Sequence, residues 1–195
     1  MHTDVIISTL SPVFDHHYTG KIVFRNMSRA DGFPFFTATR DPAFNRFLLW
    51  SAPEEEAQIF LQVDKLIRQN TLKAMIVQSI CKKTTGEWLG YLICKPFRDG
   101  VEIGLALHPV VWNTGVVFTV GSTVIEMIVR TLSGVPIYSR VTPANKKMHR
   151  VCQSYGFEKI GEATEDHATT GAPMHFDVCV LNMDKWNPFE NVQQY

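Results

Sequence analysis

Residues 102–115 combine one carboxylate, one imidazole and a glycine-containing turn within a short stretch of the chain. This stretch predicts a strand that ends at Pro109, a polar turn at residues 112–115 and then a long helix. A helix that begins directly after such a turn presents free backbone N–H groups and the positive end of its dipole. Phosphate groups bind well at such a helix end. The stretch therefore predicts a phosphate-binding turn next to a strand that carries a carboxylate.

The strand predicted at residues 101–107 places its side chains alternately on two faces. One face is apolar and holds Val101, Ile103, Leu105 and Leu107. The opposite face holds Glu102, Gly104 and Ala106, and His108 follows in phase just beyond the strand. A carboxylate beside two small residues indicates the floor of a cleft, where it can act as a general base. The alternative is an ordinary glutamate on a solvated strand face.

The spacing of hydrophobic residues and the positions of turn residues predict the elements around this strand. Strands are predicted at 21–26, 73–81, 87–94, 101–107, 136–141, 157–164 and 176–183. Helices are predicted in pieces over 31–50, then from Ser51, after Gly115 and from Ala144 to Tyr155. The order is a strand, two helices, three antiparallel strands, a helix, a strand, a helix and two strands. This order predicts a mixed α/β fold around one central sheet.

Boundary signals divide the chain into a main domain and two short ends. Residues 1–20 read as a poorly specified lead-in, 21–186 as the domain and 187–195 as a C-terminal tail. Ser51-Ala-Pro-Glu54 forms a capping box that opens a helix of about 17 residues. The apolar positions that recur along this helix are Ala57, Phe60, Val63 and Ile67.

The composition limits the class of function. The 195 residues include 19 basic and 19 acidic side chains, so the net charge is zero and argues against nucleic-acid binding. No apolar run has the length of a bilayer span, and the N-terminus lacks the cations of a signal peptide. The four cysteines are scattered, without zinc-ligand spacing. We expect a reduced cytoplasmic protein, without a metal site, that does not bind membranes.

Four motifs along this order of elements resemble one known superfamily. They are Arg40-Asp-Pro-Ala-Phe-Asn-Arg46-Phe-Leu, Val101-Glu-Ile-Gly-Leu-Ala-Leu-His-Pro109 followed by Trp112, Asn145 with Arg150-Val151 and Gly156-Phe157, and Leu181-Asn-Met-Asp-Lys-Trp186. Together they resemble the GNAT acetyltransferases over about residues 20–186, in particular the Rim-type branch of ribosomal-protein N-acetyltransferases. The resemblance implies a central mixed, mostly antiparallel sheet with flanking helices, splayed at two parallel strands.

The resemblance also implies a reaction and a cofactor. A member of this superfamily transfers an acetyl group from acetyl-CoA to an amine of a small molecule or a protein N-terminus. The strands at 101–107 and 136–142 would separate around the pantetheine arm, and the pyrophosphate would lie at the start of the next helix. The implied cofactor-binding residues are Leu107, Trp112, Asn113, Thr114, Gly115, Val116, Val117 and Asn145.

The same resemblance suggests catalytic roles for three side chains. Glu102 stands where the superfamily often places its base. Cys152 occupies the position of a frequent tyrosine acid, and the alternative for it is a buried apolar role. His108 could relay protons, and the alternative for it is a structural role.

The phosphate turn departs from the usual pattern of the superfamily. The chain has Trp112-Asn-Thr-Gly-Val-Val-Phe118 where the branch usually has Trp-Gly-Lys-Gly-Tyr-Ala-Thr. Asn113 can still adopt a left-handed conformation. The bulky side chains of Val117 and Phe118, however, reduce the space for a phosphate at the start of the helix. One alternative is therefore a GNAT fold that has lost CoA binding and acts on, or binds, an apolar small molecule. A non-catalytic domain that binds a partner protein is another.

The acceptor and the assembly are less constrained by the sequence. Residues 33–50 are aromatic and include Arg40 and Arg46, which favours a small or apolar acceptor over a lysine-rich tail. We expect a monomer or a homodimer.

Overall fold

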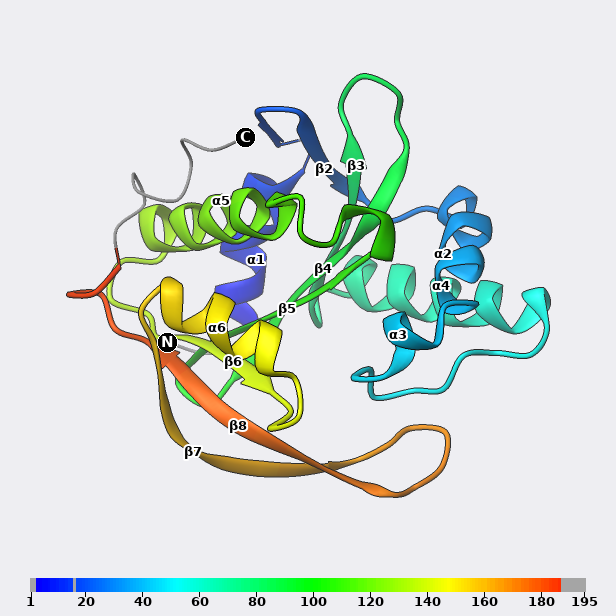
Figure 1. Cartoon of the computed structure of the whole chain (residues 1–195). Helices are drawn as coiled ribbons and strands as arrows, with labels where there is room; N and C mark the ends of the chain where they lie inside the picture. The colour runs from blue at the N-terminus through cyan, green and yellow to red at the C-terminus, as the bar shows by residue number, and fades with distance from the viewer. Residues whose placement is uncertain (1–2, 16, 187–195) are drawn as a thin grey trace.

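Eight strands form one sheet in the computed structural model, which describes residues 3–15 and 17–186. The predicted tail at 187–195 lies outside the described residues. The sheet order is β1-β2-β3-β4-β5-β6-β8-β7 (Figure 1). The strands are β1 (Tyr18–Thr19), β2 (Ile22–Asn26), β3 (Ile76–Lys82), β4 (Trp88–Phe97), β5 (Gly100–Leu107), β6 (Ile137–Val141), β7 (Phe157–Asp166) and β8 (Pro173–Leu181). The predicted mixed α/β class is confirmed.

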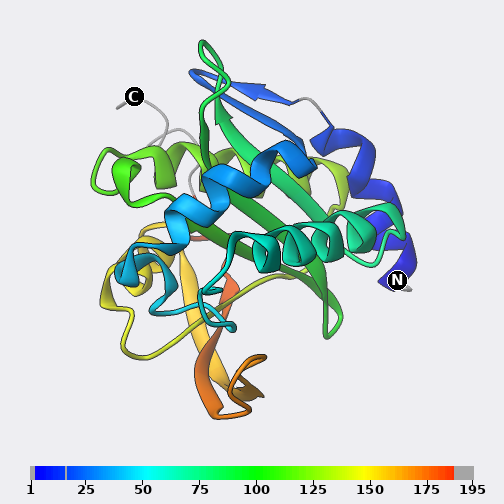
Figure 2. The same cartoon turned by 90° about the vertical axis from the view of Figure 1, so that its right-hand side faces the viewer.

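Helices cover both faces of the sheet. On one face lie α1 (Thr3–Phe14), α5 (Val116–Thr131) and α6 (Lys146–Ser154). On the other lie α2 (Gly32–Thr39), α3 (Pro42–Asn45) and α4 (Glu56–Thr71), which cross in front of the sheet in Figure 2. Two short 3-10 helices, η1 (Arg29–Asp31) and η2 (Pro109–Val111), complete the elements. We call the apolar layer under α1, α5 and α6 the main core and the layer under α2–α4 the second core. No helix among the described residues is long and apolar enough to cross a membrane.

The sheet divides between β5 and β6. These two strands are parallel and pair only at Val101 with Ile137 and Glu102 with Tyr138, whereas every other neighbouring pair is antiparallel. Beyond these two pairs, β5 continues to Leu107 and β6 to Val141 without pairing to each other. The predicted splay of two parallel strands is therefore present. Along this gap, the backbone N–H and C=O groups on the facing edges of β5 and β6 have no partner in the other strand.

The segment that we expected to be a poorly specified lead-in contains helix α1. Four of its side chains, Ile6, Ile7, Leu10 and Phe14, are at most 1% exposed and belong to the main core. Pro12 lies inside this helix, so the local sequence signal argues against it. Packing against the sheet and α5 stabilises α1, and such tertiary burial overrides local propensity.

Substitution of Ile7 tests whether α1 is part of the folded domain. We expect Ile7→Val to lower the free energy of unfolding by about 1 kcal/mol, because it removes one fully buried methyl group. Val5 lies on the same helix but is 46% exposed, so Val5→Ala should change stability by less than about 0.5 kcal/mol. Urea unfolding monitored by fluorescence measures both. Equal effects of the two substitutions would contradict the packing of α1.

The helix expected to open at Ser51 begins five residues later. Helix α4 starts at Glu56 with Glu55 as its N-cap, so the capping box predicted at Ser51 to Glu54 is wrong. The backbone N–H of Ser51 is instead bound by Thr169 Oγ1 at 3.0 Å, across a large sequence separation. The buried face of α4 also differs from the predicted stripe. It contains Ile59, Val63 and Leu66, while Phe60 and Ile67 are half-buried and Ala57 is exposed.

Candidate active site

One face of β5 has the small residues and the carboxylate that the sequence placed there. Glu102 and Ala106 are each 8% exposed, whereas Gly104 between them is exposed. A Cβ atom added at Gly104 would meet no other heavy atom within 4 Å. There is therefore open space above the middle of this strand face, next to the point where β5 and β6 separate.

Glu102 is held by two cations. Its Oε2 atom accepts a hydrogen bond from Arg140 Nε at 2.9 Å and lies 3.7 Å from Lys95 Nζ. Arg140 also donates through Nη1 to Glu165 Oε2 at 2.6 Å, so this guanidinium bridges β5 and the β7–β8 hairpin. None of the described residues donates a hydrogen bond to Oε1 of Glu102. One oxygen of the carboxylate is thus fixed by cations, and the other has no hydrogen bond from the described residues.

Arg140 is an important neighbour that the sequence analysis did not identify. Its guanidinium lies between the rings of Phe97 and Phe176, at 5.4 and 5.3 Å from their centroids. Burial lowers the pKa of Arg140, but the charge of Glu102 and the hydrogen bonds to Glu165 and Glu102 outweigh burial and raise it. The charge is therefore permanent. The only sequence signal was that Arg140 lies in the strand predicted to lie alongside residues 101–107.

The turn before α5 contains two residues in the left-handed conformation. Asn113 (φ 61°) and Gly115 (φ 85°) are both left-handed, as predicted for Asn113. Trp112 Nε1 donates to the carbonyl oxygen of Leu107 at 2.8 Å, and Thr114 Oγ1 donates to Val111 O at 2.7 Å. These bonds fix the turn onto the end of β5. Gly115 is the N-cap of α5, so the first N–H groups of the helix have no acceptor within it.

The bulky residues that follow Gly115 are directed partly into the protein. Val116, Val117 and Phe118 are half-buried and pack against the main core. The ring of Phe118 lies 6.0 Å from that of Tyr155, whose hydroxyl donates to the carbonyl oxygen of Phe118 at 2.7 Å. Tyr155 therefore ties α6 to the first turn of α5 and fixes the position of that helix end.

His108 has a structural contact at the end of β5. Its Nδ1 accepts a hydrogen bond from the backbone N–H of Val110 at 3.2 Å and so caps η2. Its ring also meets the edge of Trp88 at 6.5 Å. These contacts match the structural role weighed for His108, and proton relay stays a prediction.

Cys152 and Glu102 lie on opposite faces of the sheet. The Cys152 thiol is 3% exposed and lies 3.9 Å from Ser139 Oγ. Ser139 precedes Arg140 on β6 and so points away from the Glu102 face. Burial raises the pKa of Cys152 to about 12. Asn145, the other candidate near α6, caps that helix by accepting from Met148 N at 3.2 Å, while its Nδ2 donates to none of the described residues.

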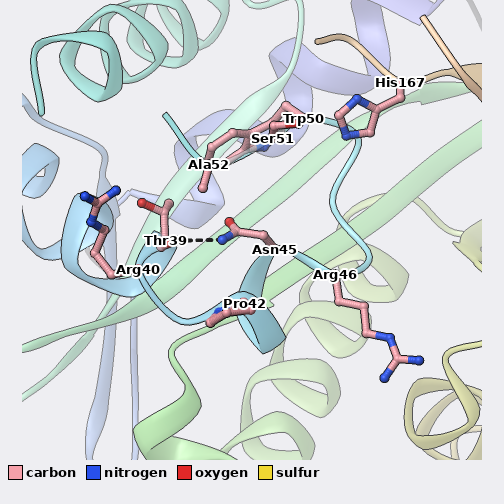
Figure 3. Close-up of a pocket in the computed structure, with 9 residues that line it drawn as sticks. All are labelled: Thr39, Arg40, Pro42, Asn45, Arg46, Trp50, Ser51, Ala52 and His167. Atoms are coloured by element: carbon pink, nitrogen blue, oxygen red, sulfur yellow. Dashed lines mark hydrogen bonds between the residues drawn. The ribbon is translucent and has the colours of Figure 1, made fainter. Parts of the chain in front are cut away.

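A pocket of about 380 Å³ opens near this strand face (Figure 3). It is lined by Thr39, Arg40, Pro42, Asn45, Arg46, Trp50, Ser51, Ala52 and His167. The tip of the β7–β8 hairpin supplies His167 and is tied to the opposite wall, because Ala168 N donates to Leu49 O at 2.7 Å. The pocket cannot be predicted from local sequence patterns, because its walls are more than 100 residues apart in the chain.

Aromatic side chains connect the pocket to the Glu102 face. The Trp50 ring lies 5.5 Å from Phe35, and Phe35 lies 5.1 Å from Tyr91. Tyr91 pairs directly with Ala106 on β5 and therefore shares its face. On the other side, Glu165, which Arg140 links to Glu102, is two residues before His167 on β7 and its loop. The pocket and the carboxylate thus belong to the same side of the sheet.

The comparisons with known proteins agree with this architecture. A family model described as an acetyltransferase (GNAT) domain matches residues 21–158. A search of curated proteins found no match. Among solved structures, a GCN5-related N-acetyltransferase from Brucella melitensis is similar with a TM-score of 0.77 at 13% identity, over 90% of this chain and 82% of that one.

Two further structures have more specific names. RimL, a ribosomal α-N-protein acetyltransferase, is similar with a TM-score of 0.71 at 12% identity, over 85% of this chain and 92% of that one. Spermidine N-acetyltransferase from Vibrio cholerae, solved with CoA and spermine, gives a TM-score of 0.67 at 15% identity, over 86% of this chain and 98% of that one. At these identities the likeness shows the fold, which confirms the Rim-type resemblance at that level. Because the family model covers most of the sequence, the chain belongs to the GNAT acetyltransferase family.

Proposed function

We propose that this protein transfers an acetyl group from acetyl-CoA to the amine of a small molecule or peptide, with Glu102 as the base. The observation that carries the proposal is the gap between β5 and β6. The gap begins at Glu102, continues beside the open space at Gly104 and leads to the N-terminus of α5. A linear cofactor arm and a terminal phosphate group are the chemistry that such a gap and such a helix end suit.

The residues around the gap fit acetyl-CoA, which supplies the acetyl group as a reactive thioester. Asn113 and Gly115 shape the turn, and the N–H groups of Val116 and Val117 offer donors to a pyrophosphate. The open edges of β5 and β6 offer backbone groups to the pantetheine amides. Asn145 Nδ2 offers a further donor. The hydroxyl of Thr114 is already bonded to Val111 and contributes to the turn instead.

Glu102 takes the proton in this proposal. Its Oε2 stays bonded to Arg140, while Oε1 accepts a proton from the acceptor nitrogen as the new N–C bond forms. Cys152 is a poor acid for the departing thiolate, because burial raises its pKa to about 12, above the value of about 8.5 of a free thiol. We therefore assign the base to Glu102 and leave the proton of the leaving group to solvent.

Calorimetric titration with acetyl-CoA and with CoA tests the cofactor site. We expect micromolar binding that weakens roughly tenfold or more in Gly115→Ala, because a side chain strains the left-handed turn and moves the phosphate donors. Gly134 at the other end of α5 has φ 76° and open space around it. Gly134→Ala is therefore a matched control that carries similar strain and should leave CoA binding unchanged.

The second candidate function is a GNAT fold that no longer binds CoA and acts on, or binds, an apolar small molecule. The observation that favours it is the β-branched Val117 where the family places a small residue. Absence of binding at millimolar acetyl-CoA would favour this candidate and overturn the first. The cleft at Glu102 should then be screened with apolar small molecules.

A further inference from the structure

The pocket beside the Glu102 face is lined by basic side chains. Arg40, Arg46 and His167 line it, and no carboxylate does. Within residues 3–15 and 17–186, neither Arg40 nor Arg46 forms an ion pair. Both arginines are exposed, and an arginine can form strong, often bidentate hydrogen bonds to a carboxylate or phosphate, so their charge is available to an anionic ligand.

Arg40 is held in position without using most of its donors. Its guanidinium lies over the Phe36 ring at 4.8 Å, and Nη1 donates to Pro53 O at 3.3 Å. A guanidinium has five N–H donors, so four remain. The Arg46 guanidinium lies over the Phe47 ring at 5.2 Å and is exposed. Figure 3 shows these two arginines on opposite sides of Asn45, with His167 across the pocket from Arg40 and the Arg46 guanidinium directed away from the other lining residues.

The rest of the pocket suits a small molecule. A cavity of about 380 Å³ is at the lower end of the range for small-ligand sites. Trp50 provides an apolar wall, and behind it the buried rings of Phe35 and Tyr91 lead through the second core to Ala106. A ligand with its charged end at the arginines therefore lies on the same side of the sheet as Glu102.

We propose that this pocket binds a carboxylate or phosphate group of the acceptor, so that the substrate is a small amine that also carries an anionic group. That the bound molecule is the acceptor rests on the proposed function, whereas anion binding in the pocket does not. A lysine-rich acceptor is disfavoured, because its neighbouring cations would meet Arg40 and Arg46.

Calorimetry with matched pairs of amines tests the anion site directly. The pairs are 2-aminoethyl phosphate with ethanolamine, and 6-aminohexanoate with hexylamine, each titrated into the full chain with and without acetyl-CoA. We expect the member with the anionic group in at least one pair to bind roughly tenfold more tightly than the partner that lacks this group, as charge-assisted hydrogen bonds predict. The two pairs distinguish phosphate from carboxylate as the preferred group.

Three variants assign the preference to the pocket. Arg40→Met and Arg46→Met should each remove most of the preference for the anionic probe, and Arg40→Lys should retain part of it. Arg68 is an exposed arginine on α4 that does not line the pocket. Arg68→Met is therefore the control, and it should leave the preference unchanged. Thermal unfolding of each variant checks that it is folded. Among the described residues Arg46 forms no side-chain hydrogen bond, so Arg46→Met is the variant expected to disturb folding least.

The outcomes separate the two proposals. Equal binding of probes with and without the anionic group, no binding of any probe, or a preference that survives both arginine substitutions overturns the anion site. Acetyl transfer to amines without an anionic group as fast as to amines with one, measured by release of free CoA thiol, overturns the inference and leaves the proposed function standing. Anion binding without any transfer overturns the proposed function and, with it, the identification of the ligand as an acceptor.

Discussion

Glu102→Gln is expected to lower kcat for acetyl transfer by about 10²–10⁴-fold, the usual loss when a general base is removed. Glutamine keeps the shape of the side chain and can still accept a hydrogen bond from Arg140, but it cannot take the proton from the acceptor. Binding of acetyl-CoA should change little, because the turn at Gly115 is at the other end of the gap. Release of free CoA thiol at saturating substrate measures kcat, and calorimetry measures cofactor binding.

Glu165→Gln is the matched control for this loss. Glu165 accepts from the same guanidinium as Glu102, so both substitutions remove one anionic partner of Arg140. Glu165 is 42% exposed in its side chain and does not lie on β5. We expect Glu165→Gln to retain kcat within a few-fold. A similarly large loss of kcat in both variants would show that the charge balance around Arg140, rather than proton transfer by Glu102, supports activity.

The second large effect is expected on stability, at Asp31. This carboxylate is 2% exposed and accepts hydrogen bonds from Arg25 Nη1, the Ser28 backbone N–H and Ser79 Oγ, each at 2.8 Å. We expect Asp31→Asn to lower the free energy of unfolding by about 3 kcal/mol, the lower end of the cost of breaking a buried pair, because Arg25 is itself 29% exposed. The melting temperature should fall by about 6–12 °C.

The pH dependence of this loss gives a sharper test. Burial raises the pKa of Asp31, but the hydrogen bonds from Arg25, Ser28 and Ser79 outweigh burial and hold the pKa below its usual value. A carboxylate with a lowered pKa stabilises the fold above its unfolded pKa of about 3.9, and this stability is lost as the pH falls through the folded value. The difference in free energy of unfolding between wild type and Asp31→Asn should therefore have its largest value at neutral pH and decrease below about pH 4.

Asp64→Asn provides the comparison for a surface pair. Asp64 contacts Arg29 at 3.1 Å, but both side chains are well exposed. This substitution should cost less than about 1 kcal/mol at any pH. If Asp64→Asn and Asp31→Asn cost the same in urea unfolding, the buried network contributes no more than an exposed one and the prediction is wrong.

Features with a strong local cause were predictable from the sequence. The period of two along residues 101–107 placed the apolar positions in the main core and Glu102 on the opposite face, because only one register buries the apolar side chains. The left-handed Asn113 was predictable for a similar reason, since asparagine tolerates that conformation and the turn requires it. Both outcomes depend on the residues within one element.

Features that depend on distant partners were not predictable. Arg140 contacts Glu102 across 38 positions of the chain, and no local sequence pattern around either residue predicts this contact. Ser51 has the local signature of a helix cap, but the hairpin tip at Thr169 binds its N–H and α4 starts later. Helix α1 contains a proline, and burial of Phe14 and its neighbours in the main core stabilises it nonetheless. In each case tertiary contact outweighs the local signal.

The separation of β5 from β6 gives this sheet two edges in its interior. Amide hydrogens on those edges, within residues 103–107 and 139–141, have no partner strand across the gap. They should exchange with deuterium faster than the alternate amides of the same strands, which pair with β4 and β8. Any ligand that bonds to the backbone in the gap slows that exchange, so deuterium uptake at these residues reports its occupancy without an assay for the reaction.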